Sequence, residues 1–216
     1  MSPALTPDLL LHAYAIGVFP MADPDEGDRV YWYAPDPRAV LPLDGLKVSR
    51  SLRQTLRRAP FTVTTDAAFP AVIAACAEPR PGREETWISE ELRRAYVHLH
   101  EVGHAHSVEC WEGEPGRSAL VGGLYGVVLG GAFFGESMFH RATDASKVAL
   151  AHLVARLRAG GFALLDVQMH TPHLARLGVV EIPRADYEGR LAAALRRRAR
   201  WDGEVDVLEA LGIAPG

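Results

Sequence analysis

Two short apolar segments of the sequence, GGAFFGESMF and LLDVQ, contain residues that could do chemistry. The first holds a single carboxylate, Glu136, and the second holds Asp166 and Gln168. A buried carboxylate costs free energy unless it is paired or hydrogen bonded, so we expect these groups to have partners or a task. If the two segments lie near each other, the polar groups converge on one pocket. A buried hydrogen-bond network that only links strands is the alternative.

Strand periodicity indicates how these groups are directed. Successive side chains of a strand point to opposite faces, so Asp166 and Gln168 share one face of LLDVQ. By the same rule, Glu136 shares its face with Phe134 and Met138. The pattern predicts a mostly apolar pocket, walled by Phe and Met, with a few placed polar groups.

Other reactive patterns fit known sites poorly. The segment HLHEVGHAHSVE brings His98, His100, His104 and His106 together, but no spacing among them matches an established metal-ligand motif. Ser137 lacks the second glycine and the strand–turn–helix context of a nucleophile elbow. The sequence has no P-loop, and the glycine-rich GGLYGVVLGG opens no helix. We therefore expect neither a metal nor a cofactor.

The composition bounds the class of protein. The chain has 216 residues, 48% of them hydrophobic, which suits either one large domain or one domain with a small appendage. A formal net charge of −4 argues against nonspecific nucleic-acid binding by the whole surface. We see no membrane helix and no signal peptide, and the two cysteines are too few for a disulfide framework. We expect a monomer in a reducing, cytoplasmic setting, away from membranes.

Two basic runs depart from this acidic average. The run KVSRSLRQTLRR contains five positive charges and no acid: Lys47, Arg50, Arg53, Arg57 and Arg58. Arg50, Arg53 and Arg57 share one face if the segment is helical. A solvated face and a contact with a polyanion both remain open for this run. The second run, RRRAR, ends a helix-like stretch, where cations favour the helix C-terminus.

Periodicity and capping signals predict a mixture of helices and strands. Helices are expected over residues 7–16, 67–76, 90–103, 145–161, 171–178 and 185–200. Strands are expected over residues 30–33, 61–65, 105–111, 120–130, 131–139, 162–168 and 179–183, with the rest of 20–38 a loop. We place a boundary between a small N-terminal domain, 1–38, and a main domain, 39–216, of the α+β class with a mixed sheet.

Longer motifs carry a family resemblance. They are AYAIGVFP, WYAPDPRAVLP, TWIS, LHEVGHAHSVECW, LVGGLYGV, GESMF, ASKVAL, LLDVQ and HLARLGVVEIPR. Through them the chain resembles the leucyl/phenylalanyl-tRNA–protein transferases over roughly residues 9 to 187. The resemblance implies an aminoacyltransferase whose main domain has the GNAT-like acyltransferase fold.

The activity that the resemblance implies is transfer of Leu, Phe or Met from aminoacyl-tRNA. The acceptor is the N-terminal α-amine of a protein that begins with Arg or Lys, and the product is marked for degradation by the N-end rule. The aminoacyl ester is already activated, so the reaction needs no metal and no cofactor. The expected partners are aminoacyl-tRNA and such acceptor proteins.

The resemblance also implies roles for residues. The family's D-x-Q motif matches Asp166 and Gln168, and its GES glutamate matches Glu136; these are the catalytic candidates. The substrate-binding candidates are Trp87, Leu124, Phe133, Met138, Ser137 and Met21. The basic helix that binds tRNA maps onto Lys47, Arg50, Arg53, Arg57 and Arg58. Met21 stands where many members have tryptophan, and the preference among Leu, Phe and Met stays open.

A mechanism follows as a hypothesis. The acceptor is an α-amine with a pKa near 8, of which about a tenth is neutral at pH 7, so it needs mainly positioning and the management of one proton. Asp166, with Gln168, is expected to orient this amine and help deprotonate it. Glu136 is expected to hold the donor's α-ammonium or its ribose end. Whether Asp166 is a general base or only an orienting group stays open.

Two other functions remain as alternatives. An N-acyltransferase that uses acyl-CoA would need a pyrophosphate loop at a helix start, whereas RLRAGG ends a helix. A non-catalytic module that binds tRNA or degrons would keep Trp87 and the arginines, but it would not need Asp166 with Gln168.

Overall fold

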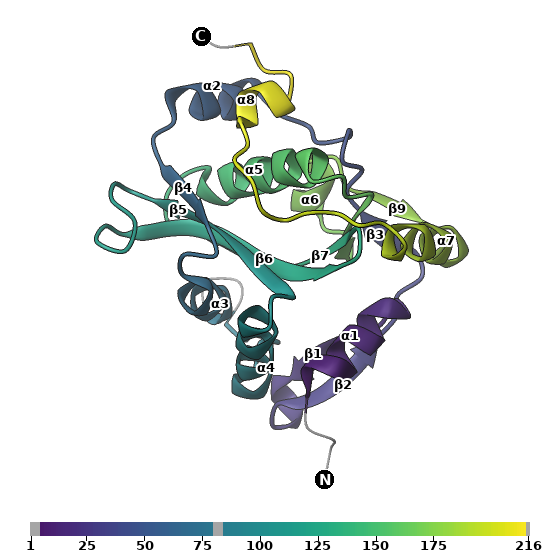
Figure 1. Ribbon diagram of the computed structural model, residues 1–216. Helices are drawn as coiled ribbons and strands as arrows, with labels where there is room; N and C mark the ends of the chain where they lie inside the picture. The colour runs from purple at the N-terminus through teal and green to yellow at the C-terminus, as the bar shows by residue number, and fades with distance from the viewer. Residues whose placement is uncertain (1–4, 80–83, 215–216) are drawn as a thin grey trace.

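The computed structural model describes residues 5–79 and 84–214. Its centre is a seven-stranded sheet of order β4-β5-β6-β7-β8-β3-β9, with helices on both faces (Figure 1). Neighbouring strands are antiparallel except β7 and β8, which are parallel. A separate hairpin of β1 and β2 lies near the N-terminal helix. The predicted α+β class with a mixed sheet is confirmed.

The elements have the following bounds. The helices are α1 Pro7–Ala15, the short 3-10 helix η1 Pro24–Glu26, α2 Arg50–Arg58, α3 Phe69–Ala77, α4 Glu90–Glu101, α5 Ala145–Ala159, α6 Pro172–Arg176, α7 Arg184–Leu195 and α8 Val207–Ala210. The strands are β1 Phe19–Asp23, β2 Arg29–Tyr33, β3 Arg38–Val40, β4 Thr62–Thr65, β5 Ala105–Trp111, β6 Leu120–Leu129, β7 Ala132–His140, β8 Leu164–Gln168 and β9 Val180–Ile182.

Helix starts follow the sequence signals closely. The hydroxyls of Thr6, Ser49 and Ser89 each accept a hydrogen bond from a backbone N–H three residues further on, at the starts of α1, α2 and α4. These bonds satisfy donors that a helix leaves unpaired at its N-terminus. Residues 50–58 of the basic run are therefore helical, which is the condition under which its arginines share one face.

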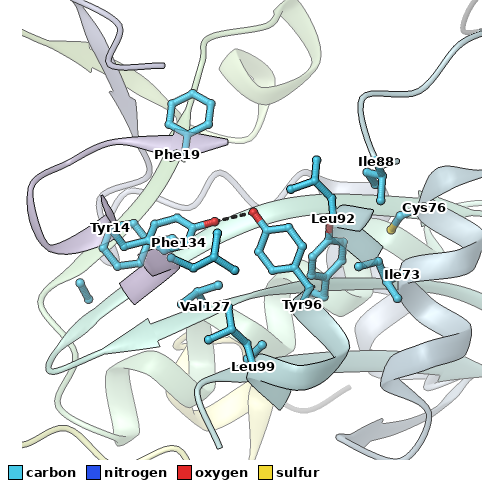
Figure 2. Close-up of a cluster of buried hydrophobic side chains, with 14 of the residues drawn as sticks. Tyr14, Phe19, Ile73, Cys76, Ile88, Leu92, Tyr96, Leu99, Val127 and Phe134 are labelled. Atoms are coloured by element: carbon cyan, nitrogen blue, oxygen red, sulfur yellow. Dashed lines mark hydrogen bonds between the residues drawn. The ribbon is translucent and has the colours of Figure 1, made fainter. Parts of the chain in front are cut away.

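The two faces of the sheet are covered by different helices. Helices α3 and α4 cover one face, while α5 covers the other, with α2 and α8 lying outside it (Figure 1). The core on the α3–α4 side also includes side chains of α1, and Figure 2 shows Tyr14 and Tyr96 meeting there beside Val127 and Phe134. The N-terminal segment is thus packed against the sheet and its helices.

Three predictions of local structure are wrong. Residues 38–40 form β3, where no strand was predicted, because they pair with β8 and β9. Residues 19–23 form β1 rather than a loop, because they pair with β2 in register from Phe19 with Tyr33 to Asp23 with Arg29. Pro20 signals a turn locally, but it is tolerated in a two-stranded ribbon that has free edges. The helix predicted over residues 185–200 is α7, which ends at Leu195, so the basic run 196–200 follows it. The basic run instead contacts the C-terminal end of α5, where the N–H of Arg200 donates to the carbonyl of Gly160 at 3.0 Å.

A β-bulge interrupts β7 at the residue of greatest chemical interest. Gly126 of β6 pairs with Gly135, and Tyr125 pairs with Ser137, so Glu136 is left without a partner in the register. An extra residue of this kind bends its strand and redirects a side chain.

The bulge overturns one expectation about direction. Phe134 packs in the core on the α3–α4 side, whereas Met138 packs against the core on the α5 side. The prediction that Phe134, Glu136 and Met138 share a face is therefore wrong, because the added residue reverses the alternation between them.

The close approach of the strands at this bulge depends on glycine. A Cβ on Gly126 would collide with the carbonyl oxygen of Phe134 and with the ring of Phe133. We predict that Gly126→Ala lowers the free energy of unfolding by about 2 kcal/mol or more, measured by urea denaturation. Gly189→Ala is the control, since nothing lies within 4 Å of its Cβ position. Because alanine favours the helix α7 more than glycine does, this variant should raise the free energy of unfolding by up to about 1 kcal/mol. Equal stabilities of Gly126→Ala and the parent would contradict this account.

Candidate active site

An apolar cavity of about 250 Å³ lies between the sheet, α5 and α6. Its apolar lining includes Leu124, Met138, Leu150, Leu153, Leu165 and Val167. Its polar lining comes from Glu136 and Ser137 of β7 and from Thr171 and His173 around α6. The cavity is therefore a concave apolar site with a few polar groups. Met138 and Glu136 line it as predicted, but no phenylalanine does, and Asp166 and Gln168 lie outside its lining.

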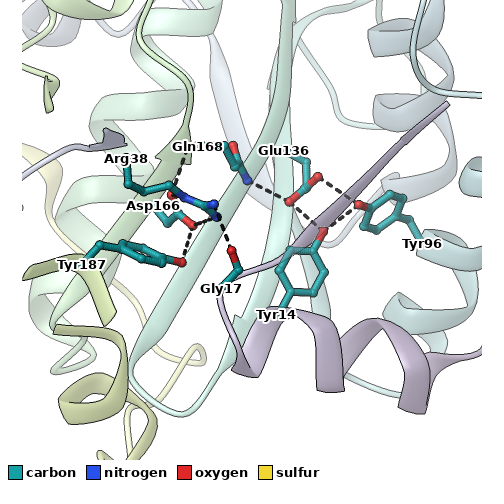
Figure 3. A network of polar contacts seen from close by, with 8 residues as sticks. All are labelled: Tyr14, Gly17, Arg38, Tyr96, Glu136, Asp166, Gln168 and Tyr187. Carbon is teal, nitrogen blue, oxygen red and sulfur yellow. Dashed lines mark hydrogen bonds and ion pairs between the residues drawn. The ribbon is translucent and has the colours of Figure 1, made fainter. Parts of the chain in front are cut away.

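Glu136 is the centre of a hydrogen-bond network beside this cavity (Figure 3). One of its oxygens accepts from the hydroxyl of Tyr14 at 2.8 Å and from the amide Nε2 of Gln168 at 3.0 Å. The other oxygen accepts from the hydroxyl of Tyr96 at 2.9 Å, and the two tyrosine hydroxyls lie 2.6 Å apart. The carboxylate thus receives donors from α1, α4 and β8 at once.

Burial decides the protonation of this group. Desolvation raises the pKa of Glu136 to about 7, and the nearby charge of Asp166 adds to the rise, although the hydroxyls of Tyr14 and Tyr96 act in the opposite direction. The pKa values of both tyrosines are raised well above their usual value, chiefly by burial. Glu136 therefore titrates near neutrality, while both tyrosines stay protonated as donors.

Asp166 has a different environment from Glu136. It is fully buried, and its two oxygens accept from Nε and Nη2 of Arg38 at 3.0 and 2.7 Å. The hydroxyl of Tyr187 at 2.8 Å and the backbone N–H of Gln168 at 2.9 Å complete its shell. Each lone pair of this carboxylate therefore has a hydrogen-bond donor.

Gln168 connects the two carboxylates. Its backbone N–H donates to Asp166, and its side-chain amide donates to Glu136. Its φ of 59° lies in the left-handed region, which is unfavourable for a residue with a side chain and is often found at functional sites. Among the described residues, nothing donates to its amide oxygen, which is left available as an acceptor.

Sequence reasoning missed four residues of this network. They are Tyr14, Arg38, Tyr96 and Tyr187. Arg38 carries the clearest signal that could have revealed it, because it is a single cation directly before the apolar residues AVL. Its guanidinium also stacks over the rings of Phe19 and Tyr187, at 4.8 and 4.6 Å from their centroids. The tyrosines resemble ordinary core residues in the sequence, because only the fold directs their hydroxyls to the carboxylates.

The predicted substrate-binding residues fall into two groups. Leu124, Ser137 and Met138 line the cavity. Phe133 is not in its lining: its ring is buried and stacks on Trp201, with the centroids 5.6 Å apart.

Trp87 and Met21 lie on the opposite side of the sheet from α5. Both are partly buried and pack against the core on the α3–α4 side. They are held near each other, because the N–H of Ala22 donates to the carbonyl of Trp87 at 3.1 Å. Their role with a substrate stays a prediction.

The predicted tRNA-binding arginines lie on the exposed side of α2. Arg50, Arg53, Arg57 and Arg58 are exposed, while Leu52 and Leu56 anchor the helix against the core on the α5 side.

The histidine-rich segment has structural contacts. Nδ1 of His106 lies 2.8 Å from a carboxylate oxygen of Asp66, and the ring of His100 stacks on the ring of Phe69. Within residues 5–79 and 84–214, no group of three or more His, Cys, Asp or Glu could hold a metal ion.

Comparison with known proteins places this site in a family. The family model for leucyl/phenylalanyl-tRNA protein transferase matches residues 40–192, and the model for the N-terminal domain of that transferase matches residues 4–36. The chain belongs to the leucyl/phenylalanyl-tRNA protein transferase family. This is a family of aminoacyltransferases, so the sequence-based resemblance is confirmed.

Named relatives support this membership over nearly the whole chain. The leucyl/phenylalanyl-tRNA–protein transferase of Rhodospirillum rubrum is 54% identical over 214 residues, which cover 99% of both chains. The transferase of Novosphingobium aromaticivorans is 57% identical, over 99% of this chain and 79% of its own length.

Solved structures give weaker likenesses. A tandem GNAT protein from the clavulanic acid biosynthesis pathway matches 83% of this chain and 57% of its own, with 16% identity and a TM-score of 0.37. Similarity at this level supports no conclusion on its own.

None of the helices in the described part of the chain is both long and apolar enough to span a bilayer.

The raised pKa of Glu136 predicts a pH-dependent stability. Between about pH 4.5 and pH 7, the folded protein keeps a proton on Glu136 that the unfolded chain has released. The stabilising contribution is complete below this window and is lost as the pH rises through it. Relative to Glu136→Gln, the parent should therefore lose on the order of 2 kcal/mol of unfolding free energy across the window, measured by urea denaturation.

Glu91→Gln, which changes an exposed glutamate of α4, is the matched control and should follow the parent. Parallel curves for the parent and Glu136→Gln would show that Glu136 does not titrate in this range.

Proposed function

We propose that this protein transfers Leu, Phe or Met from aminoacyl-tRNA to the N-terminal α-amine of proteins that begin with Arg or Lys, and so marks them for the N-end rule. The observation that carries this proposal is the apolar cavity with Glu136 in its wall, joined through Gln168 to Asp166. These are the positions that match the family's GES and D-x-Q motifs. We infer further that the protein acts in the cytoplasm as a monomer.

The cavity suits the side chain of the donor. Its volume of about 250 Å³ and its Leu, Val and Met lining would hold an aliphatic or aromatic side chain. Glu136, in the same wall, would bind the donor's α-ammonium. A bound cation lowers the pKa of a neighbouring carboxylate, so donor binding would release the proton that burial keeps on Glu136.

The environment of Asp166 favours the orienting role over the base role. Its oxygens already accept four hydrogen bonds, and its side chain has no exposed surface that an amine could reach. Through its bond to the backbone of Gln168, it would hold that residue in its left-handed conformation. We therefore treat Asp166 as a positioning residue.

Gln168 would then be the group that meets the acceptor. Its free amide oxygen would accept a hydrogen bond from the α-amine and aim the nitrogen lone pair at the ester carbonyl. The nitrogen forms a bond to the carbonyl carbon, and the bond from that carbon to the ribose oxygen breaks. The proton that leaves the nitrogen ends on the ribose oxygen.

A direct transfer assay tests the proposed function. Purified protein is mixed with radiolabelled Leu-tRNA and a peptide that begins with Arg, beside the same peptide beginning with Gly. We expect label on the Arg peptide only, because the acceptor rule depends on the first side chain. Phe-tRNA and Met-tRNA as donors extend the test to the preference of the cavity. Absence of label with all three donors would favour a binding module that lacks catalysis.

The positioning role of Asp166 gives a second prediction. Asp166→Asn weakens the hold on Gln168, so kcat should fall about 100-fold or more. The pH dependence of kcat should keep its shape, because the orienting role moves no proton through Asp166. Glu181→Gln, at an exposed position of β9, serves as the control. Loss of the acid limb of the parent profile in Asp166→Asn, where a general base would become protonated, would instead identify Asp166 as the base.

A further inference from the structure

A band of basic residues lies between helix α2 and the cavity. His173 lines the cavity from α6, and its pKa is lowered, first by partial burial and then by its basic neighbours Lys147, His140 and Arg176, which favours its neutral form. These four residues come from β7, α5 and α6, so only the fold brings them together.

The band continues to the basic helix through direct contacts. Lys147 lies 2.7 Å from one oxygen of Asp144, and the other oxygen of Asp144 accepts from Thr55 of α2 at 3.4 Å. On the other side, the backbone N–H of Lys47 donates to the carbonyl of Leu177, directly after α6, at 2.9 Å. Helix α2 is therefore fixed beside both α5 and α6.

Three members of this band have no ion pair in the described part of the chain. They are His140, His173 and Arg176, all of which are exposed, whereas Lys147 is paired with Asp144. Arg93 of α4, by contrast, is paired with Glu90. Asp144 is the acid that contacts the band, and its two oxygens are already engaged by Lys147 and Thr55.

We propose that Lys147, His173 and Arg176 form a path for the phosphates of the single-stranded 3′ end of the donor tRNA, between the helix α2 and the cavity. This rests on the proposed function, because the cavity must receive the aminoacyl group at that 3′ end. A chain that reaches from α2 to the cavity would pass this band, where Lys147 and Arg176 offer cations to its phosphates and His173 offers a ring N–H donor. The band would thus hold the last nucleotides, while α2 holds the body of the tRNA.

Three donors of increasing length separate these contributions. They are leucyl-adenosine, which has no phosphate, a leucyl-CCA trinucleotide, and complete Leu-tRNA. Lys147→Glu with Arg176→Glu should raise KM by about tenfold for the trinucleotide and for Leu-tRNA, and leave KM for leucyl-adenosine unchanged. Arg53→Glu with Arg57→Glu should raise KM for Leu-tRNA alone.

Controls separate this effect from loss of folding and of net charge. Arg94→Glu with Arg117→Glu makes the same change of charge at side chains that are 75% and 80% exposed, and should change no KM. Because Lys147→Glu places two acids side by side, Lys147→Gln with Arg176→Gln is tested as well and should give a smaller increase of the same pattern. Thermal unfolding shows whether each variant is folded.

The outcomes are distinguishable from failure of the proposed function. If the parent transfers leucine and the band variants keep the KM of the parent for the trinucleotide, the path is overturned. An increase for leucyl-adenosine as well would also overturn it, because the effect would then lie in the cavity. If the parent transfers nothing, the affinity for deacylated tRNA is measured at several salt concentrations. A shallower salt dependence of this affinity in the band variants would support the path independently of the reaction, and an unchanged salt dependence would reject it.

Discussion

The buried ion pair between Arg38 and Asp166 is the interaction on which the site depends. Two charges out of water are tolerated only when geometry and further hydrogen bonds compensate their desolvation. Here Arg38 donates twice to Asp166 and once to the carbonyl of Gly17, and Tyr187 adds a further donor. The pair therefore joins β3, β8, α7 and the end of α1. It also fixes the backbone of Gln168, whose side chain reaches Glu136.

The two carboxylates of the site have different surroundings. Asp166 faces a guanidinium, whereas Glu136 meets neutral hydroxyl and amide donors and has its pKa raised to about 7. The division suits one acid that supports the structure and one that responds to a bound cation.

Much of the framework was predictable because it is local. The caps at Thr6, Ser49 and Ser89 and the apolar periods fixed most helices and strands within a few residues. Strand β1 was missed, because its pairing with β2 is a tertiary contact that Pro20 conceals. The direction of Met138 was missed, because a bulge depends on the partner strand and leaves no mark in the alternation of one strand alone.

The sequence by itself determined the family, the α+β class and three polar residues of the site, because these follow from motifs and from short-range patterns. Only the tertiary structure decided which groups surround those residues. Tyr14, Arg38, Tyr96 and Tyr187 come from α1, β3, α4 and α7, and no spacing along the chain reports that their polar atoms meet two carboxylates. The physical reason is that burial and hydrogen bonding, which set the charge of Glu136 and the role of Asp166, are properties of the packed molecule.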